Sequence, residues 1–148
     1  MLDKIDKEIL QILQEDGRAS ANHISEIIGM SVPAIAERMR KLQESETILG
    51  YKAIVNPKRL GLDVSALITI ISESSDHYED VIKKANETSS VIQCFSTTGN
   101  GSHVILIKTQ DTGSLEKLLR EIQLWPGVKR TETQLILSSY KEGGLVPM

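Results

Sequence analysis

The chain has 148 residues, of which 40% are hydrophobic and only 3% aromatic. This length suits one medium domain or two small ones, and so few rings argue against recognition of single-stranded nucleic acid by base stacking. The one cysteine, Cys94, excludes an intramolecular disulfide and a cysteine-based zinc cluster. No segment is typical of a signal peptide or long and apolar enough to span a bilayer. We therefore expect a cytoplasmic protein.

The net charge of −3 is unevenly distributed. Residues 31–60 carry six Lys or Arg against three Asp or Glu, whereas residues 1–30 and 61–148 are each acidic. Because affinity for phosphate depends on the local patch, the basic third is a candidate for nucleic-acid contact that salt would weaken. So small a patch is expected to bind weakly as a single copy, which indicates at least a dimer.

Three short helices are predicted in the first half, each with apolar residues at helical spacing. The first begins after Asp3 and ends near Gln14, the second covers 20–28, and the third covers 31–45. Only Gly29-Met30-Ser31 separates the second helix from the third, which predicts a helix-turn-helix whose third helix enters the major groove. An ordinary helical hairpin in an all-α core has the same spacing, so the spacing alone leaves both interpretations open.

Residues 48–55 read as an extended piece, which is either a wing of the helix-turn-helix or a linker strand. The segment from Asn56 to Asp63 contains Pro57, Gly61 and three charges, and is the best domain boundary. We expect a DNA-binding domain at 1–50 and an extended linker at 51–63.

The second half has the order β-α-β-β-α-β, typical of a ferredoxin-like α+β domain. The predicted strands cover 64–71, 91–97, 104–107 and 128–140, and the predicted helices cover 76–87 and 112–125. We place this domain at 64–142, followed by a loose tail at 143–148. Right-handed crossovers put both helices on one face of the sheet. Since the first and third strands are apolar on both faces, the open face is expected to pack on a second copy of the chain.

These features together resemble the Lrp/AsnC family, the feast/famine regulators of bacteria and archaea, over the chain to about Glu142. The matching motifs in the first half are Asp6-Lys7-Glu8-Ile9-Leu10, Asp16-Gly17-Arg18-Ala19-Ser20, Gly29-Met30-Ser31, Glu37-Arg38-Met39-Arg40-Lys41-Leu42, Ile48-Leu49-Gly50-Tyr51 and Asn56-Pro57. Those in the second half are Val91-Ile92-Gln93-Cys94, Thr98-Gly99 and Pro126-Gly127-Val128. The resemblance implies a (winged) helix-turn-helix domain, a ferredoxin-like effector and assembly domain, dimers that often form octamers, and transcriptional control by small molecules, commonly amino acids.

Candidate DNA contacts lie on the third predicted helix and on the cations around it. The candidates for contact at or near base edges are Ser31, Val32, Pro33, Ala34, Glu37 and Arg38. The candidates for phosphate contact are Arg18, Arg40, Lys41 and Lys52. For Arg18 the alternative is an ordinary solvated cation in a loop. The expected partner is double-stranded DNA, read in a sequence-specific way; an architectural protein that wraps DNA with little sequence preference is the alternative.

A tentative effector site covers Thr98, Gly99, Asn100, Gly101, Ser102 and His103. In the family, the loop after Thr-Gly usually reads Asp-aromatic-Asp and lies where amino-acid effectors bind between dimers. Here Asn100 and Ser102 replace both acids, and neither would hold an ammonium group as well as a carboxylate. Ordinary amino acids are therefore doubtful ligands. Three alternatives remain open for the loop: it binds another molecule, it serves assembly alone, or it is a permissive turn.

Neither His103 nor Cys94 predicts catalysis. No second His, Cys or acid stands beside His103 at metal-ligand spacing, and a buried Cys commonly acts as a small apolar residue. We expect no enzyme activity, no cofactor, no metal and no membrane contact. An enzyme built on the ferredoxin-like domain is the alternative from another functional class.

Overall fold

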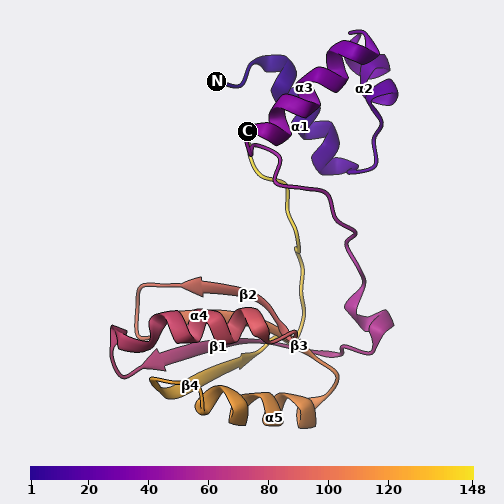
Figure 1. Ribbon diagram of the computed structural model, residues 1–148. Helices are drawn as coiled ribbons and strands as arrows, with labels where there is room; N and C mark the ends of the chain where they lie inside the picture. Colours follow the sequence, from indigo (N-terminus) through magenta and orange to yellow (C-terminus); the bar gives the residue numbers. More distant parts are fainter. The chain divides into compact units, whose positions relative to one another are not determined.

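The computed structural model describes all 148 residues, which form two compact units (Figure 1). The first unit comprises residues 1–54 and 141–148, and the second comprises residues 55–140. None of the helices combines the length and the apolar character needed to cross a membrane.

The first unit contains three helices, α1 (Lys4–Glu15), α2 (Ala21–Ile28) and α3 (Val32–Glu44), as the sequence predicts. Each begins after a residue whose side chain accepts a hydrogen bond from a free first-turn amide. These N-cap residues are Asp3, Ser20 and Ser31. At α1, Asp6 also accepts from the backbone of the cap, which completes a reciprocal capping box.

The apolar stripes of these helices meet in one small core. Its buried members are Ile9, Leu13, Ile24, Ile35 and Leu42. A core of this size gives a domain only a narrow margin of stability. Contacts at the surface between the helices therefore contribute to holding them in register.

Residues 45–56 form no strand, so the wing alternative is wrong and the segment is a linker. A wing needs a second strand to pair with. The chain instead enters a 3-10 turn, Pro57–Leu60, capped by Asn56 and ended by Gly61 in the left-handed conformation. This turn directs the chain into the second unit before a hairpin can form.

The second unit has the predicted βαββαβ order and a four-stranded antiparallel sheet with strand order β2-β3-β1-β4, the ferredoxin-like arrangement (Figure 1). Its strands and helices are β1 (Val64–Ser72), the 3-10 turn Ser75–His77, α4 (Tyr78–Glu87), β2 (Val91–Ser96), β3 (His103–Thr109), α5 (Thr112–Gln123) and β4 (Val128–Leu135).

Alternating residues divide the central strands into a covered face and an open face. On the covered face, Ala66, Ile68 and Ile70 of β1 are fully buried with Ile105 and Ile107 of β3, and pack with residues of α4 and α5. The open face carries neighbouring apolar pairs that remain only partly covered. These pairs are Leu67 with Leu106, both half-buried, and half-buried Val104 with exposed Phe95.

The last strand and the tail differ from the sequence-based expectation. β4 ends at Leu135 rather than Tyr140, since its pairing with β1 ends at Ala66 and Leu135; the last bond between the two chain segments runs from the Ile136 N–H to the Ser65 carbonyl. The tail is not loose: Val146 is hydrogen-bonded to Gln14 of α1, so the chain's end belongs to the helical unit.

Candidate nucleic-acid interface

The N-terminal turn of α3 is exposed and carries short side chains. Gly29 ends α2 in the left-handed conformation, with φ of 84°, and Ser31 then starts α3 by accepting from the Ala34 amide at 3.3 Å. Pro33 fits the first turn because its missing N–H would have no partner there. Ser31, Val32 and Pro33 are all exposed, and Ala34 is partly exposed. The helix backbone is therefore open to close approach at this end.

Glu37 and Arg40 neutralise each other on the surface of α3. The Arg40 guanidinium donates to the two Glu37 carboxylate oxygens at 2.6 and 2.9 Å, and also to Glu44. These hydrogen bonds raise the pKa of Arg40 and lower the pKa of Glu37. Arg40 is a candidate for phosphate contact. Its guanidinium must break its hydrogen bonds to both carboxylates before it can bind a phosphate.

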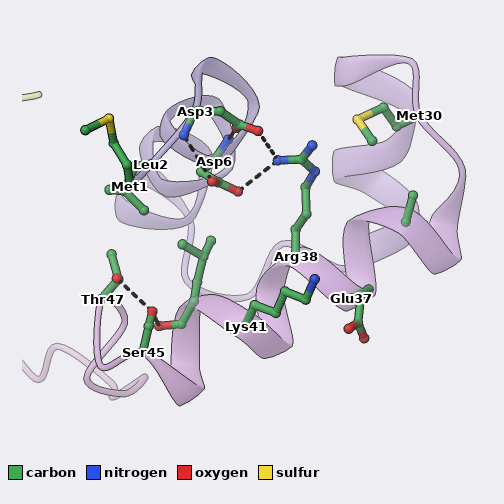
Figure 2. Close-up of a pocket in the computed structure, with 12 residues that line it drawn as sticks. Met1, Leu2, Asp3, Asp6, Met30, Glu37, Arg38, Lys41, Ser45 and Thr47 are labelled. Atoms are coloured by element: carbon green, nitrogen blue, oxygen red, sulfur yellow. Dashed lines mark hydrogen bonds and ion pairs between the residues drawn. The ribbon is translucent and has the colours of Figure 1, made fainter.

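Arg38 reaches from α3 to the start of α1, as Figure 2 shows. Its Nη1 donates to Asp3 at 2.7 Å and to Asp6 at 3.0 Å. Asp3 and Asp6 are also the two members of the α1 capping box. Arg38 therefore ties the cap of α1 to the middle of α3, and the hydrogen bond from Arg38 is the main cause that lowers the pKa of Asp3.

The structure thus separates the candidate cations into two groups. Arg38 and Arg40 are held by carboxylates, whereas Arg18, Lys41 and Lys52 are exposed and form no ion pair. Lys41 lines the same cavity of about 830 Å³ as Arg38, between the start of α1 and the middle of α3 (Figure 2). The free cations are those best placed to meet a phosphate without a competing partner.

The loop between β2 and β3 holds the tentative effector residues around a polar cavity of about 520 Å³. The cavity is lined by hydroxyl, amide and backbone groups and by no charged side chain. Its lining residues are Ser72, Tyr78, Ser96, Thr97, Thr98, Gly99, Asn100, Gly101 and Ser102. At Gly101 a Cβ would clash with the Thr69 side chain and lie 2.9 Å from the Ile70 carbonyl oxygen, so only glycine fits.

Ser102 is fixed rather than free. Its hydroxyl lies 2.7 Å from the Ser72 hydroxyl and 2.7 Å from Nδ1 of His103. His103 is 1% exposed, packs edge-on against Tyr78, and has its pKa lowered by burial, which favours the neutral imidazole. His103 is therefore below the surface of the cavity and supports the loop from beneath.

The remaining candidates for reactivity are the one cysteine and the possible metal ligands. Burial raises the pKa of the Cys94 thiol, which keeps it protonated and weakly nucleophilic near neutral pH. No three His, Cys, Asp or Glu side chains gather where they could hold a metal ion.

Sequence reasoning missed four contributors to these sites. Asp3 and Asp6 hold Arg38, and Ser72 and Tyr78 support the loop. The spacing of Asp3 and Asp6 is a capping-box signal at the start of a helix. Nothing in the local sequence, however, connects that box to an arginine more than thirty residues later.

We expect Arg38→Ala to lower the melting temperature of the helical unit by a few degrees at pH 7, since α1 loses its tie to α3. Arg38 lowers the folded-state pKa of Asp3 below its ordinary 3.8. That stabilisation is present above the unfolded-state pKa and is lost as the pH falls through the folded-state value. As the pH falls from about 5 to about 2, the free energy of unfolding of the variant should therefore decrease less than that of the wild-type protein.

The matched control is Arg40→Ala, which breaks only exposed pairs within α3. It should change the melting temperature less. Thermal unfolding followed by circular dichroism and NMR titration of Asp3 provide the two measurements. An Asp3 pKa that does not rise in Arg38→Ala would contradict the assignment.

Comparison with known proteins gives one family over almost the whole chain. Residues 2–43 match the AsnC-type helix-turn-helix domain, and residues 64–146 match the Lrp/AsnC ligand binding domain. The HTH-type transcriptional regulator FL11 of Pyrococcus horikoshii is 35% identical over 99% of this chain and 97% of its own length. The regulatory protein AsnC of Haemophilus influenzae is 33% identical over 93% of each chain.

Solved structures agree with this assignment. A transcriptional regulator of Neisseria meningitidis in complex with L-methionine has a TM-score of 0.94 at 26% identity, over 99% of this chain and 97% of that one. A feast or famine regulatory protein of M. tuberculosis complexed with L-methionine has a TM-score of 0.90 at 30% identity, over 96% of each. The chain belongs to the Lrp/AsnC family of helix-turn-helix transcriptional regulators.

Proposed function

We propose that this protein is a sequence-specific, DNA-binding transcriptional regulator that acts in the cytoplasm. The observation that carries the proposal is the exposed first turn of α3, with free cations on the same helical unit. A helix end with short side chains can approach base edges closely in the major groove. The regulator names of the relatives support the same function and give no support to an enzyme.

Base contact is assigned to the first turn of α3. The Ser31 hydroxyl can donate to or accept from a base edge, and Val32, Pro33 and Ala34 offer apolar contact to a thymine methyl. Glu37, one turn later, can accept from a cytosine amino group once it leaves Arg40. Arg38 is assigned a positioning role, because both of its carboxylate partners lie on α1.

Phosphate contact is assigned to Arg18, Lys41 and Lys52. Arg40 can join them only after it leaves Glu37 and Glu44. Three free cations on one chain give limited affinity, since each phosphate contact contributes through the release of counterions. Two or more copies acting on adjacent half-sites multiply that affinity without any new contact.

Assembly is assigned to the open face of the sheet. Leu67, Leu106 and Val104 lie next to one another there and are only partly covered. Two copies related by a two-fold axis would bury these side chains against each other. Higher assemblies, including the octamer that the family resemblance implies, would use further surfaces.

Effector binding is assigned to the cavity at the β2–β3 loop, Thr98 to His103. Two structural relatives were solved with L-methionine, so a small molecule is a reasonable ligand class. This chain, however, lines its cavity with no carboxylate. An ammonium group loses hydration on entering such a site and finds only hydroxyl and carbonyl dipoles in exchange.

An enzyme is the less supported alternative. Ser102 and His103 lie at hydrogen-bond distance, as a nucleophile and a base would. Ser102 also lies close to the Ser72 hydroxyl and the Ile70 carbonyl, and His103 is 1% exposed. A substrate therefore has no access to the imidazole, and no acid orients its other nitrogen.

For DNA binding we expect Lys41→Ala to weaken specific and non-specific duplexes by similar factors. It should lower the slope of log affinity against log salt by about 1 per chain. Val32→Ala should weaken the specific duplex only. Lys83→Ala, an exposed cation on α4, is the control. Fluorescence anisotropy across a salt series measures both; equal losses on specific and non-specific duplexes for Val32→Ala would contradict the assignment.

For assembly we expect Leu106→Glu to dissociate the dimer, because each buried leucine contributes about 1.5–3 kcal/mol and a buried unpaired charge opposes association. Leu124→Glu is the control, since Leu124 is 85% exposed at the end of α5. Sedimentation velocity measures the outcome. A wild-type monomer, or a Leu106→Glu protein that remains assembled, would refute the open-face interface.

For the effector we expect calorimetry to show weak or no binding of common amino acids to the wild-type protein. Asn100→Asp should raise their affinity, because Asn100 is exposed at the cavity. Ser102→Asp should raise it less, since the new carboxylate would face His103 Nδ1 and raise the pKa of that imidazole instead. Micromolar binding of methionine at the wild-type loop would show that another group supplies the negative charge.

A further inference from the structure

The C-terminal tail packs on α1 through a backbone contact. The Gln14 side chain donates from Nε2 to the Val146 carbonyl oxygen at 3.2 Å, and its Oε1 accepts from the Val146 N–H at 2.7 Å. One amide side chain thus pairs with both backbone groups of Val146, as a neighbouring strand does in a sheet. This contact joins residues that are 132 positions apart in the sequence.

An apolar groove of about 580 Å³ lies beside this contact. Leu10 and Leu13 of α1 line it, together with Leu49 and Tyr51 of the segment that follows α3. Pro147 and Met148 of the tail complete the lining. The apolar residues Val146, Pro147 and Met148 therefore match the chemistry of the surface beside which they lie.

The tail lies at the surface and does not enter the core. Leu145, Val146 and Met148 are 45%, 67% and 54% exposed, and none belongs to the buried cluster of the helical unit. Segments with few buried contacts open at a small fraction of the global unfolding free energy. The tail can therefore leave the groove while α1, α2 and α3 remain folded.

The contact between the tail and α1 changes the number of connections that hold the helical unit to the sheet unit. The helical unit is joined to the sheet unit first by the linker after α3, which crosses the boundary between Ile54 and Val55. The chain returns from the sheet unit after Tyr140, and the docked tail then belongs to the helical unit. A docked tail therefore gives the helical unit two attachments, and a released tail leaves one.

We propose that residues 141–148 form a releasable strap that docks against α1, beside this groove, and restrains the DNA-binding unit relative to the sheet domain. A unit on one flexible linker samples more positions than a unit with two attachments. The strap therefore narrows the range of half-site spacings that an assembled protein can engage. This consequence for DNA rests on the proposed function, whereas the docking itself does not.

Docking is tested in the full-length protein without DNA, by amide hydrogen exchange measured by NMR. Gln14→Leu removes both hydrogen bonds, so the Val146 amide should exchange about tenfold faster, as expected for the loss of such bonds, while the amides of the sheet core stay unchanged. Gln11→Leu is the control on the same helix, since Gln11 bonds Glu15 and not the tail. Equal Val146 exchange in the two variants would overturn the docking.

The restraint is tested with DNA duplexes whose half-site spacing is varied in single base pairs. Relative to wild type, Gln14→Leu and a chain truncated after Lys141 should lose several-fold of the preference for the best spacing over one shifted by half a helical turn. An unchanged preference in both variants would overturn the restraint. If the wild-type protein failed to bind any duplex, the proposed function would fall, and the exchange result on the tail would stand.

Discussion

The arginine that joins α3 to the start of α1 ties two helices of the helical unit together at their surface. The core of that unit is small, and the three helices touch one another through few buried side chains. Arg38 adds a tie at the surface, because the carboxylates that cap α1 are the ones that hold its guanidinium. The same two carboxylates therefore cap α1 and hold α3 against it.

This arrangement has an electrostatic consequence. The chain has a net charge of −3, and its one basic region includes α3. Within that helix, two of three cations are occupied by carboxylates, which leaves Lys41 free beside Arg18 and Lys52 of the same unit. Under the proposed function, so few free charges would give weak attraction to DNA and little non-specific binding. Affinity would then come from several copies joined at the partly apolar open face of the sheet.

The helices and strands were predictable from the sequence because their signals are local. Gly29, Ser31 and Pro33 mark the end of one helix and the start of the next, and the change from helical to alternating periodicity marks the second unit. The order of strands and helices then restricts the topology to the ferredoxin-like arrangement. Strand ends that depend on pairing with another strand were less predictable. β4 ends at Leu135, where its pairing with β1 ends at Ala66, although the sequence pattern continues beyond it.

In the candidate sites, too, features with a local sequence signal were predictable and contacts between distant residues were not. The exposed turn of α3 and the glycine-rich loop were found from local patterns. Other contacts join residues that are 30 to 132 positions apart in the sequence. They are the ion pair of Arg38 with Asp3, the contact of Ser102 with Ser72, and the hydrogen bonds of Gln14 with Val146. A single sequence gives no information on such pairs, because a charged or polar side chain is equally compatible with solvent. The predicted base contact of Arg38 therefore stays a prediction, and the geometry favours a positioning role.

Under the proposed function, the first turn of α3 reads bases while an assembled pair of units spans two half-sites. A hydroxyl-radical footprint of the full-length protein, on duplexes that it enriches from a random-sequence library, is the decisive experiment. We expect discrete protection with two-fold symmetry and half-sites separated by about 34–36 Å or a multiple of that distance. Uniform protection along the duplex, with no enriched sequence, would contradict it and indicate an architectural protein instead.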